Sequence, residues 1–428
     1  MGRHGTLPGA IEERERVVCH VDMDCFYAAC ERLREPPLRG EPLVVGMGYE
    51  ADEPHGAVAT ASYEAREFGV ESAQAISEAL EKLPRKVDAA KDPDLAVEEA
   101  GFYRPVDLDF YKSIAAEVKE ILHDEADRVR EVSIDEAYLD VTDRIDWDED
   151  LHSFGHSLKS RIDREVGVTA SIGIAPAMSA AKVASDHDKP DGLVVVEPGD
   201  VRDFLAPLPV EEVHGVGPVT ASEFREMGIE TAGDLAGADA TRIEERFGER
   251  GLEVHRFARG EDSRPVEPKG QPKSLNRESA FTEPTAASET KRERVRGLAG
   301  DVAERAQQEG ALYQTIGIKV VTPPFDVHTR ARSLPGPVED ADLVEEVALE
   351  LLTEFADDRV RKLGVRVSNL QFTEEDQSSL DGWENSTGCD DDDTDDNPEI
   401  PDETGSVDAS DTRRSGGADG QQSLWDFE

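Results

Sequence analysis

The sequence has no run of about 18 apolar residues, the length that a membrane-spanning helix requires. Its first twenty residues also lack the apolar centre and the small-residue cleavage site of a secretory signal peptide. Both absences argue against a membrane protein and a secreted one. We therefore expect a cytoplasmic protein with no membrane partner.

Cysteine is scarce, with four residues (Cys19, Cys25, Cys30 and Cys389) in a chain of 428. They form no CxxC pair, and no histidine lies at ligand spacing from them. This pattern excludes a disulfide framework and a zinc site of the usual kind. We expect ordinary reduced thiols.

Basic residues are also few, because 47 Lys and Arg face 95 Asp and Glu for a formal net charge of -48. Taken alone, this balance favours a protein that never meets a polyanion such as DNA. The acids are spread through every segment, however, as in proteins of extreme halophiles. In molar salt the Debye length falls to about 3 Å, so acids distant from a DNA path would repel phosphate weakly. Composition therefore leaves both possibilities open.

The length is sufficient for two to four domains, each with its own core. Strands alternate with helices up to about residue 196, and short helices with glycine turns follow over 201–260. The Pro-rich segment 263–274 has the composition of a linker, and 277–370 again mixes strands and helices. Residues 373–428 carry 19 acids and two arginines and few apolar residues, which predicts disorder.

Two acidic clusters stand at predicted strands, Asp22 and Asp24 in HVDMDCFY and Asp135 and Glu136 in SIDEAYLD. Adjacent acids are costly there unless a cation neutralises them, and carboxylates suit the paired metal ions of phosphoryl transfer. Neighbouring strand residues point to opposite faces, so Asp135 and Glu136 can both reach a metal only where the strand ends or bulges. A solvated pair of acids at a strand end is the alternative.

Four segments occur in an order that resembles the Y family of translesion DNA polymerases, most closely its DNA polymerase IV branch: HVDMDCFYA, ATASYEAREFGV, VSIDEAYLDV and ASDHDKPDGLVVV. The resemblance covers about residues 17–372. Together with the dispersed acidity, it indicates a halophilic archaeon as the source. It implies a low-fidelity, template-directed DNA polymerase that acts in translesion synthesis and DNA repair.

The resemblance also implies an α+β multidomain fold, a right-hand polymerase with palm, fingers, helical thumb and α+β little finger. The expected boundaries are 1–25 and 104–196 for the palm, 26–103 for the fingers, 197–262 for the thumb, 263–272 for the linker, 273–372 for the little finger, 373–420 for a disordered acidic tail and 421–428 for a terminal motif. The stretch 84–101 looks like an acidic insertion in the fingers.

Two Mg²⁺ ions per active site follow from the same resemblance. Asp22 and Asp135 correspond to ligands shared by both ions, Glu136 to a ligand of the catalytic ion, and Met23 to a ligand through its backbone carbonyl. Asp24 is better explained as a hydrogen-bonding partner in the turn than as a ligand.

The residues implied in dNTP binding surround these acids: Phe26, Tyr27, Thr60, Tyr63, Arg66 and Lys189. Tyr27 matches the steric gate that excludes a 2′-hydroxyl. Without the family, Phe26 and Tyr27 would be taken as core residues. Tyr63 and Arg66 are three apart on a predicted helix, so they share a face and could offer a phenol and a guanidinium to a triphosphate, or form a plain surface pair.

DNA contacts are expected at two places. Gly215 and Gly217 lie in a G-h-G turn before a helix, which resembles a helix-hairpin-helix whose backbone N–H groups bind phosphate. In the little finger, arginines are the candidates: Arg277, Arg292, Arg294, Arg296, Arg330 and Arg332. A plain helix-joining turn, and arginines that pair with surface acids, are the alternatives.

The ending QQSLWDFE places Gln421, Leu424 and Phe427 at the spacing of a sliding-clamp binding motif. Expected partners are therefore primer-template DNA, dNTP and the clamp, with the enzyme itself a monomer. Two alternative functions remain at this point. One is a noncatalytic scaffold that binds DNA and the clamp, and the other is another two-metal nucleotidyl-transfer enzyme such as a cyclase.

Overall fold

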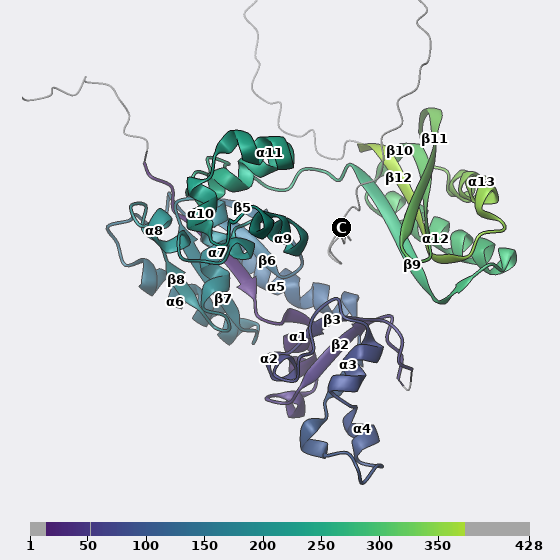
Figure 1. Ribbon diagram of the computed structural model, residues 1–428, viewed down its shortest axis with the longest axis horizontal. Helices are drawn as coiled ribbons and strands as arrows, with labels where there is room; N and C mark the ends of the chain where they lie inside the picture. The colour runs from purple at the N-terminus through teal and green to yellow at the C-terminus, as the bar shows by residue number, and fades with distance from the viewer. Residues whose placement is uncertain (1–13, 52, 373–428) are drawn as a thin grey trace, which may run out of the picture. The chain divides into compact units, whose positions relative to one another are not determined.

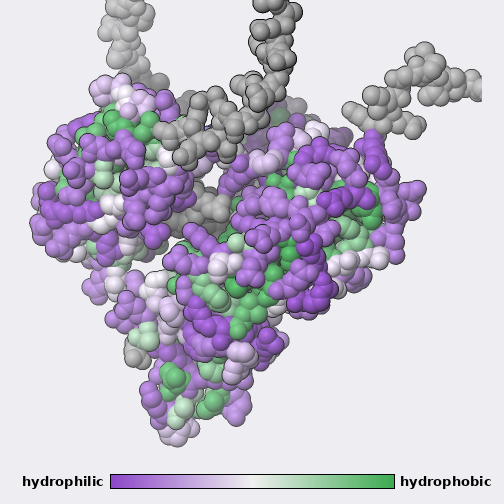
Figure 2. All heavy atoms as spheres, turned by 180° about the vertical axis from the view of Figure 1, so that it is seen from behind, coloured by the Kyte–Doolittle hydropathy of each residue, from purple (hydrophilic) through white to green (hydrophobic). Residues whose placement is uncertain are grey.

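The computed structural model describes residues 14–51 and 53–372, and the chain divides after Gln271 into two compact units (Figure 1). The expected acidic tail and its terminal motif lie outside the described residues. In the part of the chain that is described, no helix has both the length and the apolar character that crossing a bilayer requires. Hydrophilic side chains cover most of the face drawn in Figure 2.

A five-stranded sheet forms the centre of the first unit, in the order β5-β6-β1-β7-β8. Its strands are β1 (Val18–Met23), β5 (Arg128–Glu131), β6 (Glu136–Asp140), β7 (Ala170–Ala175) and β8 (Leu193–Val195). The central strand β1 pairs antiparallel with both β6 and β7, and all six of its residues are buried. Its four apolar residues, Val18, Cys19, Val21 and Met23, fit this burial on both faces.

Helices cover both faces of this sheet. On one face, α5 (Leu108–Glu125) and α6 (Leu151–Glu165) pack against Cys19 and Val21. On the other, α7 (Met178–His187) packs against β1 and β7. This helix crosses Gly173 so closely that a Cβ there would lie 2.1 Å from the carbonyl oxygen of Ala181. Alternation along β1 therefore turns His20 and Asp22 toward α7.

A smaller subdomain follows β1 in the sequence. Its sheet has the order β3-β2-β4, with β2 (Leu43–Met47), β3 (Ala57–Ala61) and β4 (Phe102–Pro105). The helical elements are α1 (Phe26–Arg34), η1 (Pro36–Leu38), α2 (Tyr63–Arg66) and α3 (Ile76–Lys82). The expected insertion contains α4 (Lys86–Ala89) and η2 (Val97–Glu99), and a bridge between Arg85 and Gly101 closes it at its base.

The first unit ends in a helical segment. Its elements are α8 (Val201–Leu205), η3 (Val210–Glu212), α9 (Pro218–Glu226), α10 (Ala232–Gly237) and α11 (Ala240–Ala258). Asp239 caps α11 by accepting the amide N–H of Thr241 at 2.8 Å, and α11 kinks at Gly248, where φ is +65°. This agrees with the short helices and glycine turns expected over 201–260.

The second unit is a four-stranded antiparallel sheet in the order β11-β10-β12-β9. Its strands are β9 (Ser274–Thr285), β10 (Ala311–Thr322), β11 (Asp326–Val338) and β12 (Val360–Phe372). Two helices, α12 (Ser288–Gln308) and α13 (Ala341–Leu352), and the turn η4 (Thr353–Phe355) bury one face of the sheet.

One expected element differs from the structure. The sequence over 131–141 has the character of a single strand, whereas β5 and β6 are two strands joined by a turn. The Ser133 hydroxyl accepts the amide N–H groups of Asp135 and Glu136 at 3.3 and 3.1 Å, which stabilises the reversal. β6 consequently begins at Glu136, the strand end that the metal hypothesis required.

Candidate active site

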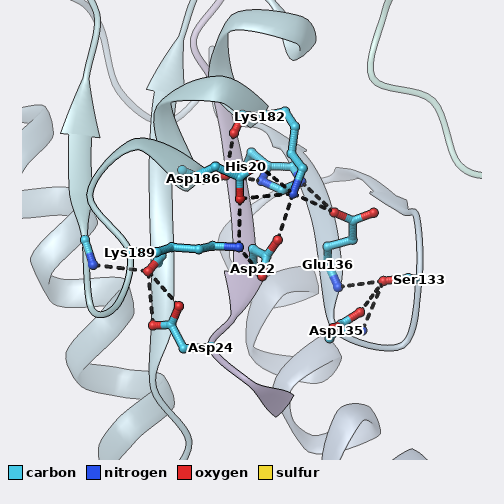
Figure 3. Close-up of polar contacts among 12 residues, drawn as sticks. His20, Asp22, Asp24, Ser133, Asp135, Glu136, Lys182, Asp186 and Lys189 are labelled. Atoms are coloured by element: carbon cyan, nitrogen blue, oxygen red, sulfur yellow. Dashed lines mark hydrogen bonds and ion pairs between the residues drawn. The ribbon is translucent and has the colours of Figure 1, made fainter. Parts of the chain in front are cut away.

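The antiparallel register of β1 and β6 places Asp22 directly opposite Glu136 (Figure 3). Asp135 precedes Glu136 in the turn, and its carbonyl oxygen accepts the amide N–H of Met23 at 2.9 Å. Two strand ends and one turn thus bring together the three acids singled out in the sequence. Met23, the last residue of β1, lies beside them.

Asp135 is held in an environment that disfavours its negative charge. Burial, helped by the negative charges of Asp22 and Glu136, raises the pKa of its carboxyl group to about 6. A hydrogen bond from Ser133 Oγ at 2.5 Å acts in the opposite direction and is outweighed. A nearby cation would relieve this cost.

Two lysines supply positive charge to the other acids (Figure 3). Lys182 Nζ lies 2.8 Å from Asp22 Oδ2 and 3.1 Å from Glu136 Oε2, and Lys189 Nζ lies 2.7 Å from Asp22 Oδ1. Burial alone would raise the pKa of Asp22, but these ammonium groups outweigh it and hold that pKa below its ordinary value. For Glu136, burial is likewise outweighed, by the neighbouring His20 imidazole and the charge of Lys182, which lower its pKa to about 2.

The donor chemistry of this site fits a hard divalent cation, because its carboxylate oxygens are the ligands that such ions prefer. Within residues 14–51 and 53–372, no three His, Cys, Asp or Glu side chains already converge as a metal-ligand set. At Asp22 and Glu136 the place that a metal ion would take is occupied by the ammonium group of Lys182, which lies between their oxygens. A metal ion bound there would have to displace it.

Sequence reasoning missed both Lys182 and His20. His20 is fully buried, its Nδ1 lies 2.8 Å from Ser185 Oγ, and its Nε2 lies 3.5 Å from Glu136 Oε2. Because Ser185 Oγ donates to the carbonyl oxygen of Lys182, it accepts from His20 Nδ1. His20 stands two residues before Asp22 on the same strand, hence on the same face, and that spacing was the available signal.

Asp24 is a hydrogen-bonding partner in the structure, but the donors to its side chain come from outside the turn in which such bonds were expected. Its carboxylate accepts hydrogen bonds from Ser171 Oγ at 2.9 Å, from the amide N–H of Asp191 at 2.8 Å and from the hydroxyl of Tyr63 at 3.3 Å. These donors come from three separate elements of the fold.

The residues expected to bind the nucleotide, apart from Lys189, belong to the small subdomain. Phe26 and Tyr27 begin α1, are 2% and 5% exposed, and Tyr27 stacks on Tyr111 with 4.6 Å between ring centroids. The Arg66 guanidinium lies 4.8 Å from the centre of the Tyr63 ring, so the two residues do share a helix face. Thr60 is buried in β3, beside them in the sequence.

The glycine turn of the helical segment has the geometry that glycine permits. Gly215 adopts φ +87°, and Gly217 is the N-cap of α9, whose first residue is Pro218. The amide N–H groups of the first turn of α9 have no partner within the helix, which suits an anion.

The arginines of the second unit have acidic partners. Arg330 pairs with Glu354 and Arg332 with Glu350, while Arg277 Nε lies 3.7 Å from Asp301. These acids belong to the helices and the helical turn on the buried face of the sheet. In this structure all three arginines therefore pair with acids, which is the alternative to DNA binding that the sequence left open. Gln421, Leu424 and Phe427 lie outside the described residues.

Comparisons with known proteins agree with this arrangement. Residues 21–186 match the impB/mucB/samB family, residues 272–381 match its C-terminal domain, and residues 198–229 match its HHH motif. The chain is 63% identical over 377 residues to DNA polymerase IV of Halobacterium salinarum, covering 88% of this chain and 90% of that protein. The chain belongs to the Y family of DNA polymerases.

Other Y-family relatives lie at greater distance. DNA polymerase IV of Methanoculleus marisnigri is 39% identical, over 86% of this chain and 98% of its own. A solved Y-family chimera of Dbh and Dpo4 superposes with a TM-score of 0.71 at 28% identity, over 83% of this chain and all of the chimera. An insertion ternary complex of Dbh DNA polymerase gives a TM-score of 0.57 at 26% identity over the same shares.

Membership of the Y family confirms the predicted fold class and activity. The enzyme is a DNA-directed DNA polymerase of the translesion type, its substrates are primer-template DNA and dNTP, and the family uses divalent metal ions. The identity to a Halobacterium protein also fits the predicted halophilic archaeal source.

Proposed function

We propose that this polymerase adds a deoxynucleoside monophosphate to a primer 3′ end with two Mg²⁺ ions. Asp22 and Asp135 would hold both ions, and Glu136 and the Met23 carbonyl would complete the protein's share of ligands. The proposal rests above all on the cross-strand pairing of Asp22 with Glu136 beside the buried Asp135. When bound, the ions supply activation of the 3′-hydroxyl and neutralisation of the triphosphate and leaving group.

The chain's own residues would orient the triphosphate. Lys189 reaches Asp22 from the loop after α7, and Tyr63 and Arg66 extend from α2 in the small subdomain. A phenol, a guanidinium and an ammonium group provide the donors that phosphate oxygens accept, with Thr60 nearby. Positioning of this kind supplies much of the rate enhancement in phosphoryl transfer.

Tyr27 would select the sugar. Its ring is fixed by stacking on Tyr111 and by burial, so it cannot move aside without disturbing the core. A rigid ring beneath the sugar would clash with a 2′-hydroxyl. Phe26, buried next to it, would support that wall.

Duplex DNA would be held by both units. Gly215 and Gly217 would present backbone N–H groups at the start of α9 to a phosphate. Arg277, Arg330 and Arg332 would need to exchange their carboxylate partners for phosphate.

The second unit also offers basic groups on its other sheet face. Lys362 and Arg366 lie there because they alternate along β12 with the buried Leu363, Val365 and Val367. Lys319 of β10 lies there too, because it pairs with Gly364 of the same row. Glu278 bridges the two lysines, 3.1 Å from Lys319 Nζ and 2.5 Å from Lys362 Nζ. We add this face to the proposed DNA contacts.

We assign the subdomains with the boundaries expected from the sequence, palm 1–25 and 104–196, fingers 26–103, thumb 197–262 and little finger 273–372. The clamp motif at Gln421, Leu424 and Phe427, the monomeric state and a cytoplasmic location stay proposals. Loss of clamp-stimulated synthesis on deleting 421–428, with unstimulated synthesis intact, would support the first of these.

Primer extension in molar KCl with Mg²⁺ tests the catalytic assignment. Asp135→Ala and Glu136→Ala should each lower the rate by at least about 1,000-fold, since each removes a ligand acting only in the reaction. Asp143→Ala is the matched control, because this acid follows β6 with a side chain that is 79% exposed. Variants as active as Asp143→Ala would refute the assignment.

A further inference from the structure

One carboxylate of the active site has no part in the reaction as described so far. Asp24 follows β1 directly and is 6% exposed. Both of its oxygens lie within 3.0 Å of Ser171 Oγ, and Oδ2 also accepts the Asp191 amide N–H at 2.8 Å. A buried carboxylate satisfied by protein donors is suited to fixing its neighbours in place.

The loop that carries Lys189 is among these neighbours. Ser171 Oγ, which donates to Asp24, accepts the amide N–H of Gly192 at 3.1 Å. Asp24 therefore holds Asp191 directly and Gly192 through Ser171. Asp191 has φ +59°, a left-handed conformation that non-glycine residues adopt at some cost, so the loop needs such anchors.

A second anchor reaches the same loop from the opposite face of the sheet. Lys159 on α6 forms an ion pair with Asp191 Oδ1 at 2.9 Å and donates to the carbonyl oxygens of Asp191 and Gly192. Its side chain is 11% exposed. With the backbone of Asp191 and Gly192 held from both sides, Lys189 extends to Asp22 and Asp186, at 2.7 and 2.8 Å.

Asp24 also contacts the other side of the proposed nucleotide site. The hydroxyl of Tyr63, at the start of α2 in the small subdomain, donates to Asp24 Oδ1 at 3.3 Å. One carboxylate thus joins the loop of Lys189 to the helix that carries Tyr63 and Arg66. Those are the two groups of residues that we assign to the triphosphate.

We propose that Asp24 is a positioning residue for dNTP binding, which sets the separation between Lys189 on one side and Tyr63 with Arg66 on the other. The inference rests on the proposed function, because it takes Lys189 as a triphosphate contact. Asp24 acts through these residues and is given no role as a metal ligand, and its oxygens are hydrogen-bonded to Ser171, Asp191 and Tyr63.

Asp24→Asn tests this role. An asparagine side chain has one acceptor oxygen, so it cannot serve Asp191 on one side and Ser171 with Tyr63 on the other. Loss of a charge-assisted hydrogen bond should weaken dNTP binding by about 10- to 100-fold. The rate of the chemical step at saturating dNTP should change by less than about threefold, because no metal ligand is lost.

The experiment uses the full chain with primer-template in molar KCl, and measures dNTP affinity and maximal rate in single-turnover incorporation. Four proteins are compared: wild type, Asp24→Asn, Lys189→Met and the double variant. The double variant should bind dNTP more weakly than Lys189→Met, but by less than the product of the two single losses, since part of the effect of Asp24 is transmitted through the loop of Lys189. Equal dNTP affinity of Asp24→Asn and wild type, or additive losses in the double variant, would overturn the proposal.

Mn²⁺ affinity, followed by electron paramagnetic resonance, distinguishes positioning from metal ligation. Asp24→Asn should bind Mn²⁺ within about twofold of wild type, whereas a loss as large as that of Asp22→Asn would make Asp24 a ligand and refute the proposal. If Lys189→Met leaves dNTP affinity unchanged, the assignment of Lys189 fails and the proposal with it. If Lys189→Met weakens dNTP binding and Asp24→Asn does not, the positioning role of Asp24 is refuted and the assignment of Lys189 stands.

Lys159→Met provides an independent variant, in case Asp24→Asn folds poorly. This change removes the anchor from the α6 side and leaves every residue around the metal-binding acids in place. It should weaken dNTP binding in the same way, and Lys159→Arg should restore part of the loss. Normal dNTP affinity in Lys159→Met would contradict control of the site through the loop.

Discussion

Asp22 and Glu136 face each other across the β1–β6 pair, and the Lys182 ammonium group lies 2.8 and 3.1 Å from their carboxylates. The lysine offsets a repulsion that two buried acids would otherwise impose on the fold. It also competes with any cation for the same oxygens. Lys182 consequently links the stability of the site to its metal affinity.

Lys182→Met should bind Mn²⁺ more tightly than wild type, by roughly tenfold, because a competing positive charge is removed. Calorimetric titration of the full chain measures this. Lys112→Met, at an exposed position of α5, is the control and should leave Mn²⁺ affinity unchanged. Weaker binding in Lys182→Met would show that the lysine supports the ligands instead of competing with the ion.

Tyr27→Ala should lower the preference for dNTP over rNTP by about 100-fold, since the wall beneath the sugar is lost. The same change removes a buried ring stacked on Tyr111 and should lower the free energy of unfolding by about 3–5 kcal/mol. Single-nucleotide incorporation measures the selectivity. Tyr27→Phe keeps the ring and should keep the preference, and a loss as large as that of alanine would contradict a steric role.

The stability of the helical segment should depend on pH through His214, whose ring centroid lies 5.6 Å from that of Phe257. Burial, helped by the Arg264 guanidinium, lowers the pKa of His214 to about 4 from 6.5. Between these values the unfolded chain binds a proton that the folded protein does not. Wild type should therefore lose stability relative to His214→Phe as pH falls through this window, by up to about 2 kcal/mol.

Urea unfolding in molar KCl at pH 7 and pH 4.5 measures the difference for His214. His152→Phe, at an exposed position, controls for removal of an imidazole. The prediction would be contradicted if the difference in free energy of unfolding between wild type and His214→Phe were the same at both pH values.

Lys291 should be essential to the second unit, because it is fully buried and donates to three carbonyl oxygens. Its Nζ lies 2.8, 2.7 and 2.9 Å from the oxygens of Phe355, Ala356 and Asp358. Lys291→Met would leave these acceptors without their donor and cost about 3 kcal/mol or more. Calorimetry of the full chain measures it, with Lys269→Met in the exposed segment before β9 as control. An unchanged transition temperature would refute this role.

Much of the fold follows from local sequence patterns. The alternation of strands and helices up to about residue 196, the short helices of 201–260 and the linker composition of 263–274 have counterparts in the elements of the first unit and in the boundary after Gln271. The residues around Ser62 also change from strand-forming to helix-forming types, and Ser62 accepts the amide N–H of Ala65 as the cap of α2.

Features that depend on long-range contacts could not be predicted from the sequence. Lys182 meets Asp22 only because α7 crosses the sheet at Gly173, and the two residues are 160 positions apart. The partners of Arg330 and Arg332 likewise come from helical elements about 20 residues away, which periodicity does not reveal. The turn at Ser133 was missed because its side-chain hydrogen bonds break a run of strand-forming residues.

We propose that Asp22, Asp135 and Glu136 hold the metal ions of the reaction, which predicts how many ions the enzyme binds. The most direct test counts the Mn²⁺ ions bound to the complex of full-length enzyme, chain-terminated primer-template and correct dNTP, by electron paramagnetic resonance in molar KCl. We predict two tightly bound ions per complex in wild type and in Asp143→Asn, and the loss of at least one in Asp22→Asn. The same count in Asp22→Asn and wild type would contradict the account.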